Sequence, residues 1–259
     1  GPQDAITIIG DSNNVTITGN VTSNASTGPR GSYGSGLYIS SGASNTIVLN
    51  GNMTMTGNGP GDAIELDTSN SNTITMTGNI STVGDTAHGI GLGTSNLNTI
   101  SVSGNITSNG NVAVGLNITG SDSNDLTMIG NITTKGSTAW GINITYTGRN
   151  GSESNNVTMT GNITTEGTNG TAIGINGRES NDVTMTGDIV TKELNGYGLY
   201  LNGSDSNTAI ITGSISTEGK DAYGVYIYTG SDSNSSTIIG NISTSGFQSS
   251  GVYLSSNDN

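Results

Sequence analysis

Three carboxylates stand together in one short stretch, at Asp62, Glu65 and Asp67. Glycoside hydrolysis needs two such groups at a defined separation on the reacting face, so these residues are the candidates for polysaccharide cleavage. His88 is the single histidine and there is no cysteine, which leaves nucleophilic triads and histidine-based metal sites without their parts. We expect His88 to face solvent. The prediction is that the chain is not an enzyme and has no catalytic residue, cofactor or metal, with a polysaccharide-degrading β-helix enzyme as the weaker alternative.

A second set of carboxylates recurs within one short motif. Gly-Ser-Asp-Ser-Asn occurs three times and contains Asp122, Asp205 and Asp232. Recurrence of this kind is typical of structural turns, in which the Asp side chain accepts a backbone hydrogen bond. Calcium ligation by the same oxygens is the alternative.

Asparagine supplies the most abundant candidate chemistry. Sixteen Asn-x-Ser/Thr sequons occur, and this motif is the acceptor of N-linked glycans. Chance is the competing explanation, because a chain rich in Asn, Ser and Thr forms sequons by composition alone. If the segments that contain these sequons stack as neighbouring β-strands, glycans on adjacent segments would stand only about 5 Å apart. We therefore expect only part of the sites to be occupied. The candidate sites are Asn14, Asn20, Asn24, Asn52, Asn79, Asn105, Asn117, Asn131, Asn143, Asn150, Asn156, Asn162, Asn169, Asn202, Asn234 and Asn241.

The sequence that positions these groups is a repeat. Nine blocks share an Asn, five residues of alternating character and a Gly. Successive glycines are 32, 27, 26, 26, 31, 26, 26 and 27 residues apart, a base period of 26 with two insertions. A repeat this short cannot enclose its own core and must stack on its neighbours. The recurring residues are Asn13, Asn45, Asn72, Asn98, Asn124, Asn155, Asn181, Asn207 and Asn234, and Gly19, Gly51, Gly78, Gly104, Gly130, Gly161, Gly187, Gly213 and Gly240.

Within each block apolar residues alternate with Thr and Ser. A first strand has two inward residues, such as Ile74 and Met76, and a short second strand has one, such as Ile80. A third strand follows, with inward residues such as Ile90 and Leu92. This period of two indicates β-strands with one solvated face.

These patterns predict an all-β fold, a parallel β-solenoid (β-helix) of about nine rungs with three short strands each. Strands stacked at about 4.8 Å give roughly 43 Å of height. A 26-residue turn with three uneven strands favours the right-handed sense. We expect one domain over residues 1–259, with loop insertions near 24–34 and 146–153. The Asn column is expected to hydrogen-bond along the stack, and the Gly column to permit a tight bend.

Composition narrows the functional class. The chain has 19 acidic and 6 basic residues, which repel a phosphate backbone and supply no basic stripe, so no nucleic-acid partner is predicted. No apolar run is long enough to span a bilayer, and membrane insertion is not predicted. The charged-then-apolar pattern of a signal peptide is absent, which fits either a cytosolic protein or a mature chain whose leader has been removed. Together with the sequons, this favours an extracellular or cell-surface location.

The blocks resemble a known style of repeat. The segment SNNVTMTGNITTEG at 154–167 and the segment YGVY at 223–226 are similar to the degenerate repeats of bacterial surface and autotransporter passenger proteins of the right-handed β-helix class. The resemblance covers nearly the whole chain. It implies adhesion or surface coating as a class of function.

Tyrosines gather toward the C-terminal third strands. Their rings could form an aromatic stripe for sugars or pack on one another. They are Tyr197, Tyr200, Tyr223, Tyr226, Tyr228 and Tyr253.

The first residues, 4–13, and the last, 251–259, have the same phase of the repeat and no charged cap. An uncapped end rung is a template for another copy, and a head-to-tail contact that does not close generates a filament. We therefore predict a structural subunit of an extracellular filament or cell-surface appendage, N-glycosylated, with itself and covalent glycans as partners. A fragment of a glycan- or host-binding adhesin, with surface carbohydrates as partners, is the alternative.

Overall fold

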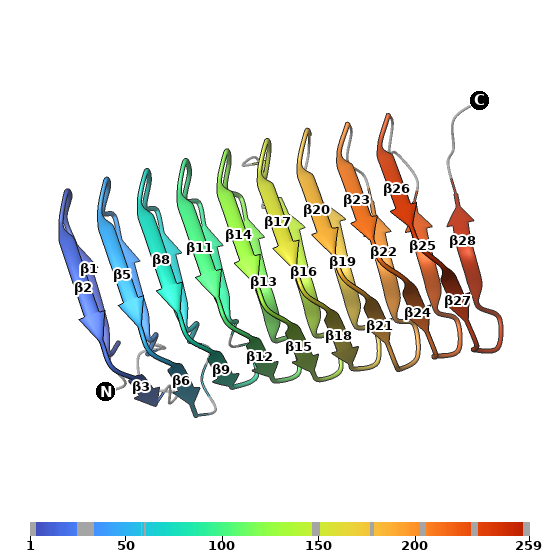
Figure 1. Ribbon diagram of the computed structural model, residues 1–259, viewed down its shortest axis with the longest axis horizontal. Coiled ribbons are helices and arrows are strands. Elements are labelled where there is room, and N and C mark those ends of the chain that lie inside the picture. The colour runs from blue at the N-terminus through green and yellow to red at the C-terminus, as the bar shows by residue number, and fades with distance from the viewer. Residues whose placement is uncertain are drawn as a thin grey trace.

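The computed structural model describes residues 4–24, 34–57, 59, 61–86, 88–146, 151–176, 179–202, 206–228 and 233–255. They form a parallel β-solenoid whose rungs stack along one long axis, with the N-terminal rung at one end and the C-terminal rung at the other (Figure 1). Three parallel sheets, A, B and C, run along this axis with ten, nine and nine strands. The central residues of both predicted insertions lie outside the described residues.

Each sheet collects every third strand of the chain. Sheet A contains β1 (Ile6–Ile9), β4 (Leu37–Ser40), β7 (Ile64–Asp67), β10 (Ile90–Gly93), β13 (Val114–Thr119), β16 (Trp140–Thr145), β19 (Thr171–Asn176), β22 (Tyr197–Leu201), β25 (Tyr223–Ile227) and β28 (Ser250–Leu254). Sheet B contains β2 (Asn14–Thr18), β5 (Thr46–Asn50), β8 (Thr73–Thr77), β11 (Thr99–Ser103), β14 (Asp125–Ile129), β17 (Asn156–Thr160), β20 (Asp182–Thr186), β23 (Thr208–Thr212) and β26 (Ser235–Ile239). Sheet C contains β3 (Val21–Asn24), β6 (Met53–Thr56), β9 (Ile80–Val83), β12 (Ile106–Asn109), β15 (Ile132–Lys135), β18 (Ile163–Glu166), β21 (Ile189–Thr191), β24 (Ile215–Thr217) and β27 (Ile242–Thr244).

Each rung passes through sheets B, C and A in turn. Strands β2 to β28 make nine such rungs, and β1 adds one strand to sheet A ahead of them. The nine recurring glycines, from Gly19 to Gly240, are separated by about eight turns of the solenoid. The predicted parallel solenoid with three strands per rung is confirmed, and its right-handed sense stays a prediction.

The inward side chains of the three sheets meet in one continuous core. In the rung of β8, β9 and β10, no inward apolar side chain is more than 3% exposed: Ile74, Met76, Ile80, Ile90 and Leu92. Each lies over its counterpart one rung away, because the sheets pair in parallel register, as Ile74 does with Ile100. The alternation of apolar and hydroxyl residues therefore fixes which face of each strand is buried.

The recurring asparagines form a continuous hydrogen-bonded ladder at the entry to sheet B. The backbone N–H and the side-chain Nδ2 of Asn98 both donate to Oδ1 of Asn124, at 2.9 and 3.0 Å. Asn124 repeats this pattern with Oδ1 of Asn155, at 3.1 and 3.0 Å. The same pair of bonds links all nine asparagines, from Asn13 to Asn234. The buried amides thereby satisfy one another along the stack.

The recurring glycines stack at the corner between sheets B and C. Gly104 has a φ of +155°, in the region that favours glycine. A Cβ there would also overlap the carbonyl oxygen of Gly78 in the rung before. The column therefore excludes side chains for two reasons, conformation and close approach.

Hydroxyl groups occupy part of the interior that the apolar pattern did not predict. Buried serines form a second ladder, in which the Ser69 and Ser95 backbone N–H groups donate to Oγ of Ser95 and Ser121, at 3.0 and 2.9 Å. In sheet C the second inward position is also Ser or Thr in every strand except β6, where it is Met55; examples are Ser108 and Thr191, exposed by 0% and 1%. Apart from β6, the short second strands thus contribute one apolar and one hydroxyl residue to the core.

The described residues contain no helix that is long and apolar enough to cross a membrane.

Candidate functional site

The outer face of sheet A contains the three clustered carboxylates. Asp62, Glu65 and Asp67 are half-buried and line one depression of about 340 Å³ at β7 and β10. Its floor is glycine, because Gly91 and Gly93 replace side chains in the next rung. The Asp62 carboxylate fills the space above Gly91, where a Cβ would overlap Oδ2. The structure therefore brings the three predicted residues together.

Each of the two innermost carboxylates has a structural partner. The His88 backbone N–H donates to Asp62 Oδ1 at 2.8 Å, and the Ser35 hydroxyl donates to Glu65 Oε2. Burial raises the pKa of Asp62 from 3.8 to about 7, and the bond from His88 opposes the shift. Burial and the Asp62 charge raise the pKa of Glu65 from 4.5 to about 7.

These shifts couple the depression to folding stability. The folded state binds both protons more tightly than the unfolded chain does. The stability that they contribute is therefore complete below about pH 4 and is lost as the pH rises through about 7.

The prediction that His88 faces solvent is right in part, because its side chain lies on the outer face of sheet A but is half-buried there. A Cβ at Gly89 would point at Ile106 in the core, so Gly89 and Ile90 both face inward and the preceding His88 is turned over the face of sheet A. Its ring is half-buried, and Nδ1 accepts a hydrogen bond of 3.1 Å from the Val114 backbone N–H. Burial lowers the His88 pKa from 6.5 to about 4. The neutral ring therefore contributes stability that is lost as the pH falls from about 6.5 through about 4.

The period of the repeat could have placed His88 correctly. It follows Asp62 by 26 residues, one base period, and so belongs on the same column of sheet A as that carboxylate. Ser35, which belongs to no recurring motif, occupies the column one rung earlier, since Leu37 pairs with Ile64.

The recurring turn aspartates are represented in the described residues by Asp122. Its Oδ1 accepts the Glu153 backbone N–H at 3.0 Å, and its own N–H donates to Oδ1 of Asn96 at 2.6 Å. These are the bonds of a structural turn that repeats along the stack. Asp205 and Asp232 lie outside the described residues. No group of three or more His, Cys, Asp or Glu suited to a metal occurs in the described part of the chain.

The tyrosines of sheet A stack on one another. Tyr200 and Tyr226, on neighbouring strands, have ring centroids 5.5 Å apart and an interplanar angle of 23°. Tyr197 and Tyr223 stack at 5.7 Å and 24°. The ring faces between rungs are therefore used for packing, and Tyr197 and Tyr200, at the N-terminal end of the stack, also line a cavity.

The sequons separate into classes in the structure. Those that follow the ladder glycine are exposed, and their side-chain oxygen accepts the backbone N–H of the next rung, as Asn105 Oδ1 does from Asn131 at 2.8 Å. The atom that carries an N-linked glycan, Nδ2, is left for modification. The column with this geometry comprises Asn20, Asn52, Asn79, Asn105, Asn131 and Asn162.

Other sequon asparagines use Nδ2 for internal hydrogen bonds. Asn143 is half-buried and donates to Asn117 Oδ1 at 2.8 Å, and Asn156 donates to Asp125 Oδ1 at 3.1 Å. Asn234 belongs to the buried ladder, and Asn150 lies outside the described residues. Of the remaining candidates, Asn14, Asn24, Asn169 and Asn241 are exposed, and Asn117 and Asn202 are half-buried.

The end rungs present core residues at the surface. Val252 and Leu254 of β28 are 54% and 66% exposed, whereas Leu199 and Leu201 in the same inward columns are fully buried. Partly buried apolar residues that border the core also belong to the rungs at the two ends: Ile6, Val15, Ile17, Ile227, Ile238 and Ile242. Both ends therefore offer apolar columns of the same kind.

Comparison with protein-family models, curated proteins and solved structures finds no match to this chain.

Proposed function

We propose that the chain is a structural subunit of an extracellular filament or cell-surface appendage, in which copies stack head to tail. The observation that carries this proposal is the self-complementarity of the end rungs. Four of the six inward columns are apolar at both ends, two in sheet A and one each in sheets B and C, and each sheet ends in a strand whose outer edge can pair with a parallel strand. Val252 and Leu254 are 54% and 66% exposed, so burying them under a second copy would stabilise the contact by about 1–2 kcal/mol for each side chain.

The strand count sets the geometry of the joint. Sheet A has ten strands and sheets B and C have nine, so β28 of one copy and β1 of the next would occupy the same layer. A joint in which all three sheets continue requires β1 of the second copy to leave sheet A. The second copy then supplies β4 to pair with β28, and its Leu37 and Ile39 cover Val252 and Leu254.

The exposed sequon column supports a glycan coat on such a filament. Its oxygens are held by the ladder along sheet C, so a glycan on Nδ2 would leave these hydrogen bonds in place. Successive rungs are about 4.8 Å apart, and occupied sites must therefore be spaced by empty ones. The acidic charge of −13 adds repulsion between neighbouring filaments.

Assembly can be tested with a charge on the end rung. Leu254→Asp puts a carboxylate into an inward column, and because this residue is already exposed, each separate copy is expected to stay folded. We expect the wild-type chain to form filaments in sedimentation velocity and negative-stain microscopy, and the variant to remain as single rods. Tyr253→Asp is the matched control, since it faces outward on the same strand and should still assemble. Wild-type rods that stay single at high protein concentration, or equal assembly of Leu254→Asp, would contradict the proposal.

A further inference from the structure

A second concave site lies on the outer face of sheet A, between the carboxylate depression and the tyrosine stack. It has a volume of about 470 Å³ and spans β13, β16, β19 and β22. This is within the usual range of ligand pockets, about 300–1,000 Å³. Four strands at about 4.8 Å extend it by roughly 14 Å along the axis, which suits an elongated ligand. We name it the Trp140 groove.

The groove exists because large and small side chains alternate along the stack. Val114 and Thr171 are nearly fully buried at its base, and Trp140 and Tyr197 stand between and beside them. A Cβ at Gly141 would point at Ile163 in the core, so Gly141 faces inward and Trp140 is turned outward.

A glycine in the next rung also leaves the space that the indole ring occupies. A Cβ at Gly174, one rung further, would overlap the Trp140 ring, so the indole lies across this glycine. The edge of the ring meets Tyr200, with centroids 6.3 Å apart and an interplanar angle of 83°. The aromatic wall is thus built from three rings in a fixed arrangement, Trp140, Tyr197 and Tyr200.

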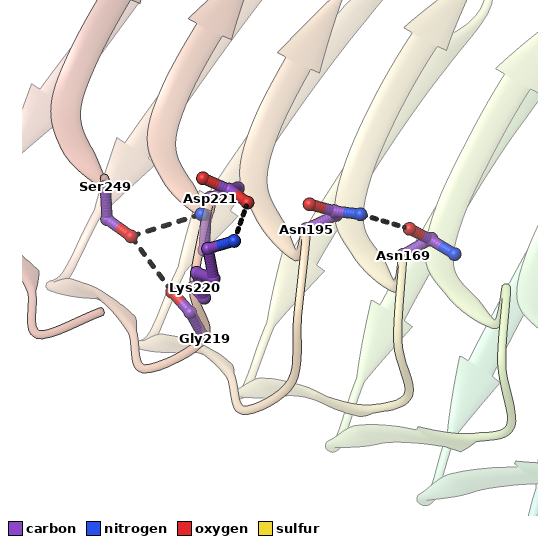
Figure 2. Close-up of polar contacts among 7 residues, drawn as sticks. Asn169, Asn195, Gly219, Lys220, Asp221 and Ser249 are labelled. Carbon is purple, nitrogen blue, oxygen red and sulfur yellow. Dashed lines mark hydrogen bonds and ion pairs between the residues drawn. The ribbon is translucent and has the colours of Figure 1, made fainter. Parts of the chain in front are cut away.

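Two asparagines supply polar atoms of opposite kind. Asn143 uses its Nδ2 to donate to Asn117 at 2.8 Å, which leaves its oxygen as an acceptor toward the groove. Asn169 accepts from Asn195 Nδ2 at 2.8 Å through its oxygen and keeps its nitrogen as a donor, directed away from Asn195 (Figure 2). A ligand for this groove must therefore both donate and accept hydrogen bonds.

We propose that the Trp140 groove binds a neutral oligosaccharide segment of a free polysaccharide. Sugar rings offer C–H faces that pack on aromatic rings, and their hydroxyls both donate and accept. Among the described residues, none that lines the groove is charged, and the chain has a net charge of −13, which disfavours acidic ligands. A proline-rich peptide also suits aromatic grooves, but proline has no N–H to donate to the Asn143 oxygen.

The chain's single tryptophan makes a direct assay possible, since Trp140 is the sole source of tryptophan fluorescence. The unglycosylated full chain is titrated with neutral hexasaccharides of the cello-, manno- and chito-series. Hexagalacturonate and a proline-rich decapeptide are titrated in parallel. We expect a saturable change in Trp140 emission with at least one neutral series, and at least about tenfold weaker binding of the acidic sugar and the peptide.

Two variants test the groove and one serves as control. Gly174→Ala should push the indole from its seat, and Tyr200→Ala removes part of the wall; each should weaken binding by about tenfold or more while circular dichroism stays unchanged. Gly93→Ala is the matched control, because the nearest atom to its Cβ would be 3.8 Å away and it lies outside the groove. It should bind as the wild type does.

Three results would overturn the proposal. These are no saturable change with any neutral hexasaccharide up to about 10 mM, unaltered affinity in both Gly174→Ala and Tyr200→Ala, and preferential binding of hexagalacturonate or the peptide. The assay uses the outer face of sheet A alone, so its outcome is independent of filament assembly.

Discussion

Replacing one rung of the asparagine ladder should destabilise the whole stack, and Asn124→Ala is the sharpest case. The side chain is 1% exposed and makes four hydrogen bonds. Two are accepted from Asn98 at 2.9 and 3.0 Å, and two are donated, to the Ser95 carbonyl at 2.8 Å and to Asn155 Oδ1 at 3.0 Å. The variant leaves the buried Asn98 backbone N–H without its acceptor.

The magnitude follows from these bonds. Each contributes about 1 kcal/mol net, and an orphaned buried donor costs about 1–3 kcal/mol, so we expect a loss of about 4 kcal/mol in the free energy of unfolding. Chemical denaturation followed by circular dichroism measures it, and faster hydrogen exchange at the Asn98 amide locates it. Asn156→Ala is the matched control, because this neighbour is exposed and should lose less than about 1 kcal/mol. A loss in Asn124→Ala no larger than in Asn156→Ala would refute the reasoning.

Three further predictions concern the protonated carboxyls, a buried hydroxyl and the sequon column. Asp62→Asn should remove part of the fall in stability between about pH 4 and about pH 7, which can reach about 1.4 kcal/mol per pH unit for each carboxyl; thermal unfolding across this range measures it, and an unchanged slope would contradict the raised pKa. Thr191→Val should gain about 1 kcal/mol in denaturation, because Thr191 Oγ1 is buried without a hydrogen-bond partner among the described residues, whereas Ser108→Ala should lose stability because it breaks a bond to the Val114 carbonyl at 3.2 Å; the reverse order would refute the assignment. On native material, Asn105→Asp should keep the ladder oxygen, as Asp188 does in the same column at 2.7 Å, and remove a glycan from the intact mass; an unchanged mass would exclude that site.

The stacked strands, their buried face and the Asn and Gly columns could be predicted from the 26-residue repeat of the sequence. The strand pattern at Ile74, Met76 and Ile80 predicts the buried face correctly, because alternation leaves only one face apolar. Gly104 and Asn124 could be assigned to columns because the period places like residues over one another. The serine ladder was not predicted, since serine in a turn has the same appearance whether it faces solvent or the next rung.

The side-chain positions on the outer face of sheet A could not be predicted from the sequence. The position of Trp140 depends on Gly141 turning inward and on Gly174 one rung away, and neither follows from alternation. For His88 the outer face was predicted correctly but its exposure was not, because the contacts with Asp62 and Val114 that half-bury it come from the neighbouring rungs. Which large side chain lies over which small residue in the next rung, as Trp140 does over Gly174, is known only when the strand register is known.

The filament is tested most directly by cryo-electron microscopy of the assembled chain at a resolution that separates strands. Head-to-tail assembly predicts nine rungs per subunit, an axial repeat of about 43 Å, and β28 of one copy paired with β4 of the next in sheet A. Single rods, or a repeat of roughly 48 Å with β1 still in place and a gap in sheets B and C, would contradict it.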